Sequence, residues 1–598
     1  MITPAPFWNN HTQAFYRGNI VLDLLQHRIA MAAGREPADL LITNVRFLDV
    51  FSGELRREDV AIGTGVIVGF GPREAKETFD AGGKILLPGL IDAHIHIESS
   101  MLSPARFAEL VLPHGTTCVV ADPHEIANVA GTEGIRYFLD CARSLPLGIR
   151  LAIPSCVPAA PFEDAGAELP AETIKPFMKE PETASLGEMM NFPGVLGGDG
   201  DTLKKILAAR EAGLGVDGHA PGVLGRGLDA YTVTGIGNTH ECPSKEDALE
   251  NLARGAYIFI REGSAAKNLK ALLPCVTPLN ARRFALCTDD RHAEDLIREG
   301  HMDHILRLAV AQGLPPVGAV IMCTLNAAEA QGLKGKGAIA PGWDADLILV
   351  DDMQNFTVRR TWVGGRLAAM DGYVLQPLKG PDASALCQSV RTAPLEPKDL
   401  ELAIPSGKAR VIRLSPGSLL TYSLICDVAC DSEGRFAPEK NPEICQVAVI
   451  ERHKASGKIG LGLLAGYGLR GGAIACTIAH DSHNIVVAGD SKAAMHAAVE
   501  ELIRIQGGCA VCVGSRVAGS LPLPLGGLMS EDDPRKVSQT LAKLNSLAHE
   551  ALHIPQDVDP FMTLSFMALP VIPSLKITAR GLFDVDRFTF TSVDAGKA

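Results

Sequence analysis

The sequence has no apolar run long enough to span a bilayer. Its first ten residues, Met1 to Asn10, also lack the basic patch followed by an apolar stretch that marks a secretory signal. A basic stripe is missing too, because Lys and Arg total 56 against 69 Asp and Glu, which gives a formal charge of −13. We therefore expect a cytoplasmic protein whose partners are neither nucleic acid nor membrane.

Cysteine pairs with metal-binding or redox spacing are almost absent. The fourteen cysteines are scattered, and Cys509–Cys512 is the only pair with CxxC spacing. This pair lies in an apolar, strand-like run and has no second pair to complete a zinc site. We expect reduced thiols throughout, and we expect this pair to pack in a core.

A chain of 598 residues, of which 46 % are hydrophobic, is expected to form two to four domains. Short, Gly-broken, β-rich segments flank a long region in which apolar strands alternate with helical patterns. We predict an N-terminal helix and β-sandwich part, a central α/β domain, return strands that complete the β-domain, and, after a Pro-rich linker, a C-terminal α/β domain. The predicted ranges are 1–84, 85–335, 336–379 and 398–598.

The central region contains eight apolar, strand-like runs at intervals of about thirty residues, which is typical of βα units around a parallel sheet. Eight such units predict a (β/α)8 TIM-type barrel, with its active site at the C-terminal ends of the strands. The predicted strands are Ile85–Ile91, Thr116–Ala121, Ile149–Ile153, Ala184–Gly187, Leu214–Asp217, Gly235–Asn238, Tyr257–Ile260 and Phe284–Cys287.

Polar side chains follow these strands where a barrel would bring them together. His94 and His96 lie two positions apart, so on a strand they point to the same side. Each polar residue alone has an ordinary explanation, such as a buried histidine, a turn or a helix cap. Together on one rim they predict a site for two divalent cations. The predicted ligands are His94, His96, Glu188, His219, His240 and Asp289.

Within this set, we predict that His94, His96 and Asp289 hold one cation and that His219 and His240 hold the other, with Glu188 between them. Imidazole and carboxylate donors suit Mn, Fe or Zn. Two cations that share a water lower its pKa and give hydroxide at neutral pH. Asp289 is then placed to accept the proton of that water and deliver it to a leaving group.

Several longer blocks carry a resemblance to a known family. The run Leu87–Ser100 (LPGLIDAHIHIESS) resembles the first-strand signature of the amidohydrolase superfamily. Further blocks, inside and outside the barrel, resemble the adenine deaminase family within it. These are His114–Val129, Leu186–Val195, Asp217–Gly222, Arg261–Ser264, Cys287–Arg291, Gly471–Asn484 and Phe561–Thr578. One departure is the run Asn238–Glu241 (NTHE), in which we expect an acidic residue just before the predicted ligand His240.

The resemblance implies hydrolytic deamination of adenine to hypoxanthine and ammonia, with hydroxide adding to C6 of the purine. This reaction also needs a proton or hydrogen-bond donor to N1. Adenosine deaminases place a glutamate three residues after the fifth-strand histidine, but here Gly222 occupies that position. Another acid must therefore serve. The candidates are Glu98, Glu125, Glu241 and Glu188; His124 and Ser264 are expected beside the substrate or behind the ligands.

Three questions stay open at this level. The enzyme could be another amidohydrolase that acts on a different aminated base or a cyclic amide, or a barrel that has lost its chemistry. The segment His480–Asn484 is interpreted as a polar turn, and the alternative is a lid or a loop that completes a neighbouring subunit's pocket. Symmetry favours a homodimer.

Overall fold

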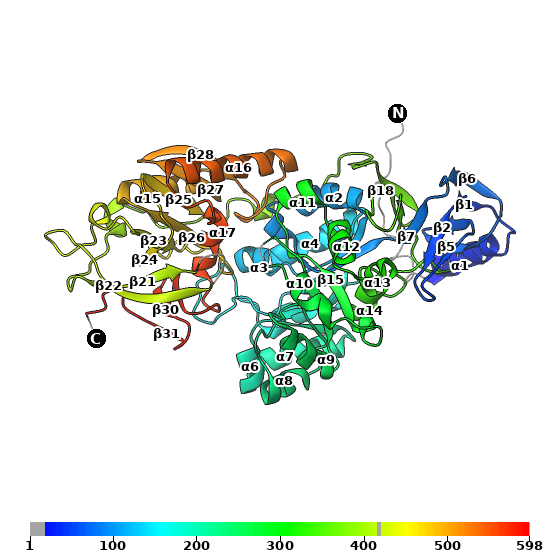
Figure 1. Ribbon diagram of the computed structural model, residues 1–598, viewed down its shortest axis with the longest axis horizontal. Coiled ribbons are helices and arrows are strands. Elements are labelled where there is room, and N and C mark those ends of the chain that lie inside the picture. Colours follow the sequence, from blue (N-terminus) through cyan, green and yellow to red (C-terminus); the bar gives the residue numbers. More distant parts are fainter. Residues whose placement is uncertain (1–17, 265, 416–419, 597–598) are drawn as a thin grey trace.

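The computed structural model describes residues 18–264, 266–415 and 420–596. Figure 1 shows three bodies along the longest axis: small β-sheets in blue at one end, a helix-covered barrel in the middle, and the C-terminal domain in yellow to red at the other end. Of the predicted N-terminal helical segment, α1 (Gly18–Ala32) is described, whereas residues 1–17 lie outside the described residues. No helix among the described residues is long and apolar enough to cross a membrane.

The central body is a parallel barrel, which confirms the predicted fold class. Neighbouring strands pair in parallel from β8 through β12 and from β13 through β15. Gly237 N–H donates to Val216 O between β12 and β13, and β16 pairs with β8 in the register Asp289–Ile95. The strands are β8 (Leu90–His96), β9 (Thr116–Ala121), β10 (Gly148–Ile153), β11 (Thr183–Met189), β12 (Gly215–Gly218), β13 (Asn238–Thr239), β14 (Tyr257–Arg261), β15 (Phe284–Cys287) and β16 (Asp289–Asp290).

The first predicted strand, Ile85–Ile91, is wrong because it joins two strands of different sheets. β7 (Ile85–Pro88) pairs antiparallel with β17 (Leu347–Val350) in the flanking sheet, and the barrel strand β8 begins only at Leu90. The change occurs at Gly89, where a Cβ atom would lie 2.1 Å from Thr117 Oγ1. An unbroken apolar run looks the same in either sheet, so periodicity could not show the change. The sixth strand, predicted at Gly235–Asn238, is also shifted and forms at Asn238–Thr239.

Amphipathic helices cover the barrel. In α4, Ile135, Phe138 and Ala142 recur at helical spacing and are buried, so one stripe faces the strands. Ser103 caps α2 by accepting the Arg106 N–H. The covering helices are α2 (Pro104–Val111), α3 (His124–Ala130), α4 (Thr132–Ser144), α5 (Ala171–Ile174), α6 (Phe192–Gly197), α7 (Gly200–Glu211), α8 (Gly225–Thr232), α9 (Lys245–Ala253), α10 (Leu269–Leu272), α11 (Ala293–Glu299), α12 (Met302–Ala311), α13 (Pro316–Met322) and α14 (Leu325–Ala330).

Strands from both flanks of the barrel share one sheet, as predicted for a discontinuous β-domain. The order is β20-β19-β18-β17-β7-β2-β3, so residues before and after the barrel are neighbours. A second sheet has the order β5-β4-β1-β6, and Phe47, Leu86 and Trp362 pack in the core between the sheets. The remaining strands are β1 (Ala38–Thr43), β2 (Arg46–Asp49), β3 (Glu54–Arg56), β4 (Val60–Gly63), β5 (Val66–Phe70), β6 (Ala75–Asp80), β18 (Val358–Val363), β19 (Arg366–Met370) and β20 (Tyr373–Val374).

The C-terminal domain is built on an eight-stranded sheet with the order β22-β21-β24-β23-β26-β25-β27-β28. Cys509 and Cys512 lie on β27 and belong to different hydrophobic clusters, so they pack on opposite faces and cannot share a metal ion. All fourteen cysteines are free. The elements are β21 (Lys408–Leu414), β22 (Thr421–Asp427), β23 (Ile444–Ile450), β24 (Ile459–Ala465), β25 (Gly472–Cys476), β26 (Ile485–Gly489), α15 (Lys492–Arg504), β27 (Gly508–Val513), β28 (Arg516–Pro522), α16 (Pro534–Ala551), α17 (Pro560–Ser565), β29 (Leu575–Thr578), β30 (Gly581–Asp584) and β31 (Thr589–Phe590).

The C-terminal domain docks on the barrel beside the ends of β8 and β9. Ser530 N–H donates to Met101 O, and Ser103 N–H donates to Ser530 O, both at 2.9 Å. Gly526 has a φ of +68°, and a Cβ atom there would lie 2.3 Å from Ile126 Cδ1 on α3. This close approach places the C-terminal domain directly over the barrel rim.

Replacing Leu87 with alanine tests the burial of β7, which its assignment to the flanking sheet requires. Leu87 is fully buried, so we expect the variant to lose about 2–5 kcal/mol of unfolding free energy, measured by urea denaturation. Leu207→Ala is the control, since that side chain is 55 % exposed. Equal effects of the two substitutions would contradict the assignment.

Candidate metal centre

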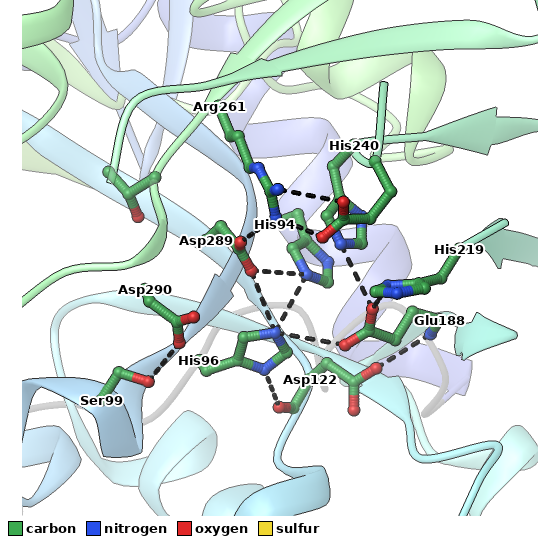
Figure 2. Close-up of polar contacts among 12 residues, drawn as sticks. His94, His96, Ser99, Asp122, Glu188, His219, His240, Arg261, Asp289 and Asp290 are labelled. Atoms are coloured by element: carbon green, nitrogen blue, oxygen red, sulfur yellow. Dashed lines mark hydrogen bonds and ion pairs between the residues drawn. The ribbon is translucent and has the colours of Figure 1, made fainter. Parts of the chain in front are cut away.

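His94 and His96 end β8 and point into the barrel mouth (Figure 2). The His96 Nδ1–H donates to Asp122 O at 2.9 Å, which leaves the lone pair of Nε2 facing the cluster. The Nε2 atoms of His94 and His96 lie 3.2 Å apart. Two ring nitrogens this close must share a proton or bind a common cation.

Glu188, at the end of β11, lies at the centre of the cluster. Its Oε1 is 3.3 Å from His96 Nε2, and its Oε2 is 2.5 Å from His219 Nδ1 and 3.2 Å from His240 Nε2. The Glu188 N–H donates to Asp122 Oδ2, which fixes the backbone behind the carboxylate. One carboxylate therefore contacts histidines from three different strands, as a bridging ligand requires.

Asp289 reaches the cluster from the opposite side. Its Oδ1 lies 3.2 Å from His96 Nε2 and 3.6 Å from His94 Nε2, and its Oδ2 accepts a hydrogen bond from Arg261 at 2.7 Å. Asp289 has a φ of +62°, a left-handed conformation that costs about 1–2 kcal/mol for a residue other than glycine. Thr288, which donates from N–H and Oγ to Asp92, holds the chain in place just before it.

The cluster is buried, and burial strengthens the effect of its neighbouring charges on the pKa values of its carboxyl groups. Five of the six predicted ligands are buried, and the side chain of His219 is 22 % exposed. Burial alone raises the pKa of the Glu188 carboxyl, but His219, His240 and His96 outweigh it and hold this pKa well below its usual range. The imidazoles of His94 and His96, with Arg261, do the same for the pKa of Asp289. Both carboxyl groups are therefore ionised at neutral pH.

These donors fit divalent cations. Two sets, His94–His96–Asp289 and His94–Glu188–His240, each have ligand atoms within 4.8 Å of one another. They contain imidazole nitrogens and carboxylate oxygens, which are the ligands of Zn, Mn and Fe sites. The structure therefore brings together all six side chains predicted as ligands, including His219, which contacts Glu188.

Of the remaining predicted residues, all lie beside the cluster or its partner Arg261 except Ser264. Glu98, His124 and Glu125 lie close to the cluster, with His124 Nδ1 3.5 Å from Glu188 Oε1. Glu241 accepts hydrogen bonds from Arg261 on both carboxylate oxygens. Ser264 is not brought to the ligands, because its hydroxyl donates to Asp295 on α11 at 2.5 Å and accepts the His292 N–H.

Sequence reasoning missed the roles of Arg261 and Asp122. Arg261 links Asp289 and Glu241, and Asp122 supports both His96 and Glu188. Arg261 ends β14 and Asp122 follows β9, at the same rim as the ligands, and this position is the signal that could have identified them. The segment at His480 was predicted as a turn; it lies between β25 and β26 and contacts Glu125 of the barrel.

A cavity lies between this rim and the C-terminal domain. Glu98, Glu125 and Asp290 line it from the barrel, and Phe561 and Phe566 are among the apolar residues that line it from the C-terminal domain. Glu98 Oε2 is buried and has no hydrogen-bond partner in the described structure. The cavity therefore has carboxylates on the barrel side and aromatic rings on the side of the C-terminal domain.

Comparison with known proteins agrees with this geometry. Residues 85–368 match the model of the amidohydrolase family, and residues 418–589 match the adenine deaminase C-terminal domain. A protein named "Adenine deaminase" from Nitratidesulfovibrio vulgaris is 54 % identical over 95 % of this chain and 99 % of its own. An "Adenine deaminase 2" from Desulfotalea psychrophila is 43 % identical over 96 % of this chain and all of its own. An "Adenine deaminase" from Geobacillus kaustophilus is 44 % identical over 96 % and 99 %.

Replacing Glu188 with glutamine tests its place between two cations. The amide has no charge, so we expect the variant to retain about half the divalent metal of the parent and to lose at least about 100-fold in activity. Metal content is measured by elemental analysis. Glu182→Gln is the matched control, because Glu182 is also buried but pairs with Arg143 away from the rim. Full metal content in the Glu188 variant would remove its ligand role.

Proposed function

Because the chain belongs to the adenine deaminase family of the amidohydrolase superfamily, we propose that it hydrolyses adenine to hypoxanthine and ammonia. The observation that carries this proposal is the buried cluster of four histidines and two carboxylates beside a cavity with apolar walls. The family relationship supplies the substrate, and the cluster supplies the chemistry that such a substrate needs.

We assign His94, His96 and Asp289 to one divalent cation and His219 and His240 to the other, with Glu188 between them. When bound, such a pair supplies hydroxide at neutral pH by lowering the pKa of water. We propose Mn or Fe, with Zn as an alternative, since mixed imidazole and carboxylate sets accept all three. The assignment is supported by the distances of 3.2–3.6 Å that join these carboxylate oxygens to His94, His96 and His240.

Asp289 is our candidate for moving the proton. As water adds to C6, the Asp289 carboxylate accepts its proton and then delivers it to the departing amino group, so ammonia leaves as a neutral molecule. Arg261 keeps this carboxylate ionised and oriented through its hydrogen bond to Oδ2. The left-handed backbone at Asp289 sets the direction of its side chain.

The donor to N1 can be chosen among the predicted acids from their contacts. Glu125 and Glu241 both use their two oxygens to accept hydrogen bonds from cationic or imidazole groups, and Glu188 contacts three imidazoles. Glu98 differs, because its Oε2 is buried, lines the cavity and has no hydrogen-bond partner in the described structure. We therefore assign the contact with N1 to Glu98; burial also raises its pKa to about 7, which favours a proton on this carboxyl.

The direct test is metal analysis and an adenine-to-hypoxanthine absorbance assay on the same preparation. We expect two divalent cations per chain and release of ammonia from adenine, with none from adenosine, guanine or cytosine. Release from another base, or from a cyclic amide alone, would favour a different amidohydrolase reaction. A preparation that contains no metal and gains no activity with Mn, Fe or Zn would favour a barrel that has lost its catalytic activity. The homodimer and the cytoplasmic location stay predictions.

Replacing Glu98 with alanine tests the N1 contact. Loss of a positioned proton donor is expected to lower kcat about 100- to 10,000-fold, while metal content stays at the parent level. Glu262→Ala is the control. Glu262 is also buried and its pKa is also raised, but it does not line this cavity, and its carboxylate accepts the Leu269 N–H. An unchanged kcat in the Glu98 variant would exclude Glu98 as the donor.

A further inference from the structure

One of the contacts between the C-terminal domain and the barrel rim is centred on a carboxylate, Glu125. Glu125, in the first turn of α3, accepts a hydrogen bond from His480 Nδ1–H at 2.7 Å on Oε1 and one from His483 Nε2–H on Oε2. His480 and His483 belong to the loop that joins β25 to β26, more than 350 residues away in the sequence. The side chains of Glu125 and His483 are 4 % and 1 % exposed, so water does not replace these contacts.

Glu125, His480 and His483 could instead hold a third cation, but the position of the proton on His483 is inconsistent with such a site. The Ala479 N–H points at His483 Nδ1 at 3.3 Å, so Nδ1 is the acceptor. In a neutral imidazole the proton is then on Nε2, which faces Glu125 and has no lone pair left for a metal. Burial lowers the pKa of His483 to about 4, which keeps the ring neutral. Glu125 is therefore held by two donors.

The loop itself is fixed from behind. Arg452, which is fully buried, donates to His483 O, to Gly526 O at 2.9 Å and to Ser389 in the linker. His453 Nε2–H donates to Ser482 O at 2.7 Å. Because Gly526 also packs against Ile126 on α3, the loop and the helix that carries Glu125 have a common support. The two imidazoles are therefore rigidly presented to the barrel.

Contacts continue from Glu125 to the cluster. His124 Nε2 is 3.6 Å from Glu125 Oε1, and His124 Nδ1 is 3.5 Å from Glu188 Oε1. His124 also stacks edge-on against the ligand His96, with ring centroids 4.5 Å apart. A displacement of Glu125 would therefore move His124, which lies against both the central carboxylate and one histidine of the centre.

We propose that His480 and His483 are positioning residues for the deamination: they hold Glu125, and through it His124, so that Glu188 and His96 keep the geometry of the metal centre. In this proposal the C-terminal domain contributes two positioning residues to the active site. This inference rests on the proposed function only for its catalytic readout, because retention of bound metal reports on the same contacts without any substrate.

The test compares alanine with amide replacements in the full-length, metal-loaded enzyme. His480→Asn puts an amide N–H in the place of Nδ1–H, and His483→Gln puts one in the place of Nε2–H. H480N/H483Q therefore keeps both donors to Glu125. H480A/H483A removes them. We expect the alanine variant to lose about 10- to 100-fold in kcat, with little change in KM, and to release metal to EDTA faster by a similar factor. The amide variant is expected to regain most of both properties.

His496→Ala is the control, because His496 lies in the same domain and hydrogen-bonds Leu395 O without touching the barrel. Thermal unfolding of each variant separates loss of fold from loss of positioning. Parent-level kcat and metal retention in H480A/H483A would overturn the proposal, and so would an amide variant as impaired as the alanine variant. Three cations per parent chain, falling to two in H480A/H483A, would overturn it in favour of a metal site. If the parent enzyme does not deaminate adenine, only the proposed function is contradicted. The rate of metal release to EDTA still tests whether His480 and His483 position Glu125.

Discussion

The structure depends on one buried carboxylate, Glu188, that is surrounded by imidazoles. Moving an isolated carboxylate out of water costs several kcal/mol, so Glu188 is stable in the barrel only with compensating partners. His96, His219 and His240 supply them at 2.5–3.3 Å. A centre of this kind needs side chains from many strands at one point, and a parallel barrel provides this because all its strands end at one rim.

The rest of the chain keeps that rim in place. Asp122 fixes the backbone of Glu188 and the ring of His96, while Asp92 fixes Thr288 beside the left-handed Asp289. These contacts are all within the barrel. The C-terminal domain adds a second layer, since its loop at His480–His483 contacts Glu125 and its phenylalanines line the cavity that Glu98 and Glu125 line from the barrel. The barrel and the C-terminal domain thus share both the contacts of Glu125 and the lining of the cavity.

Much of this arrangement was predictable because its signals are local. His94-x-His96 and the polar residues after successive strands could be identified one by one, and a barrel requires them to meet. The strand at Ile85–Ile91 was wrong because an apolar run does not reveal which sheet it enters. The contact of Glu125 with His480 could not be predicted, since it joins segments 355 residues apart and depends on how two domains dock. Arg261 was missed because its partners, Asp289 and Glu241, come from other strands.

The most direct measurement is anomalous diffraction at the manganese edge from crystals of the full chain grown with Mn²⁺. The account predicts two peaks on either side of Glu188, separated by about 3.5–4 Å as in other two-metal sites, and none between Glu125, His480 and His483. A single peak, or a peak at the Glu125 group, would contradict it.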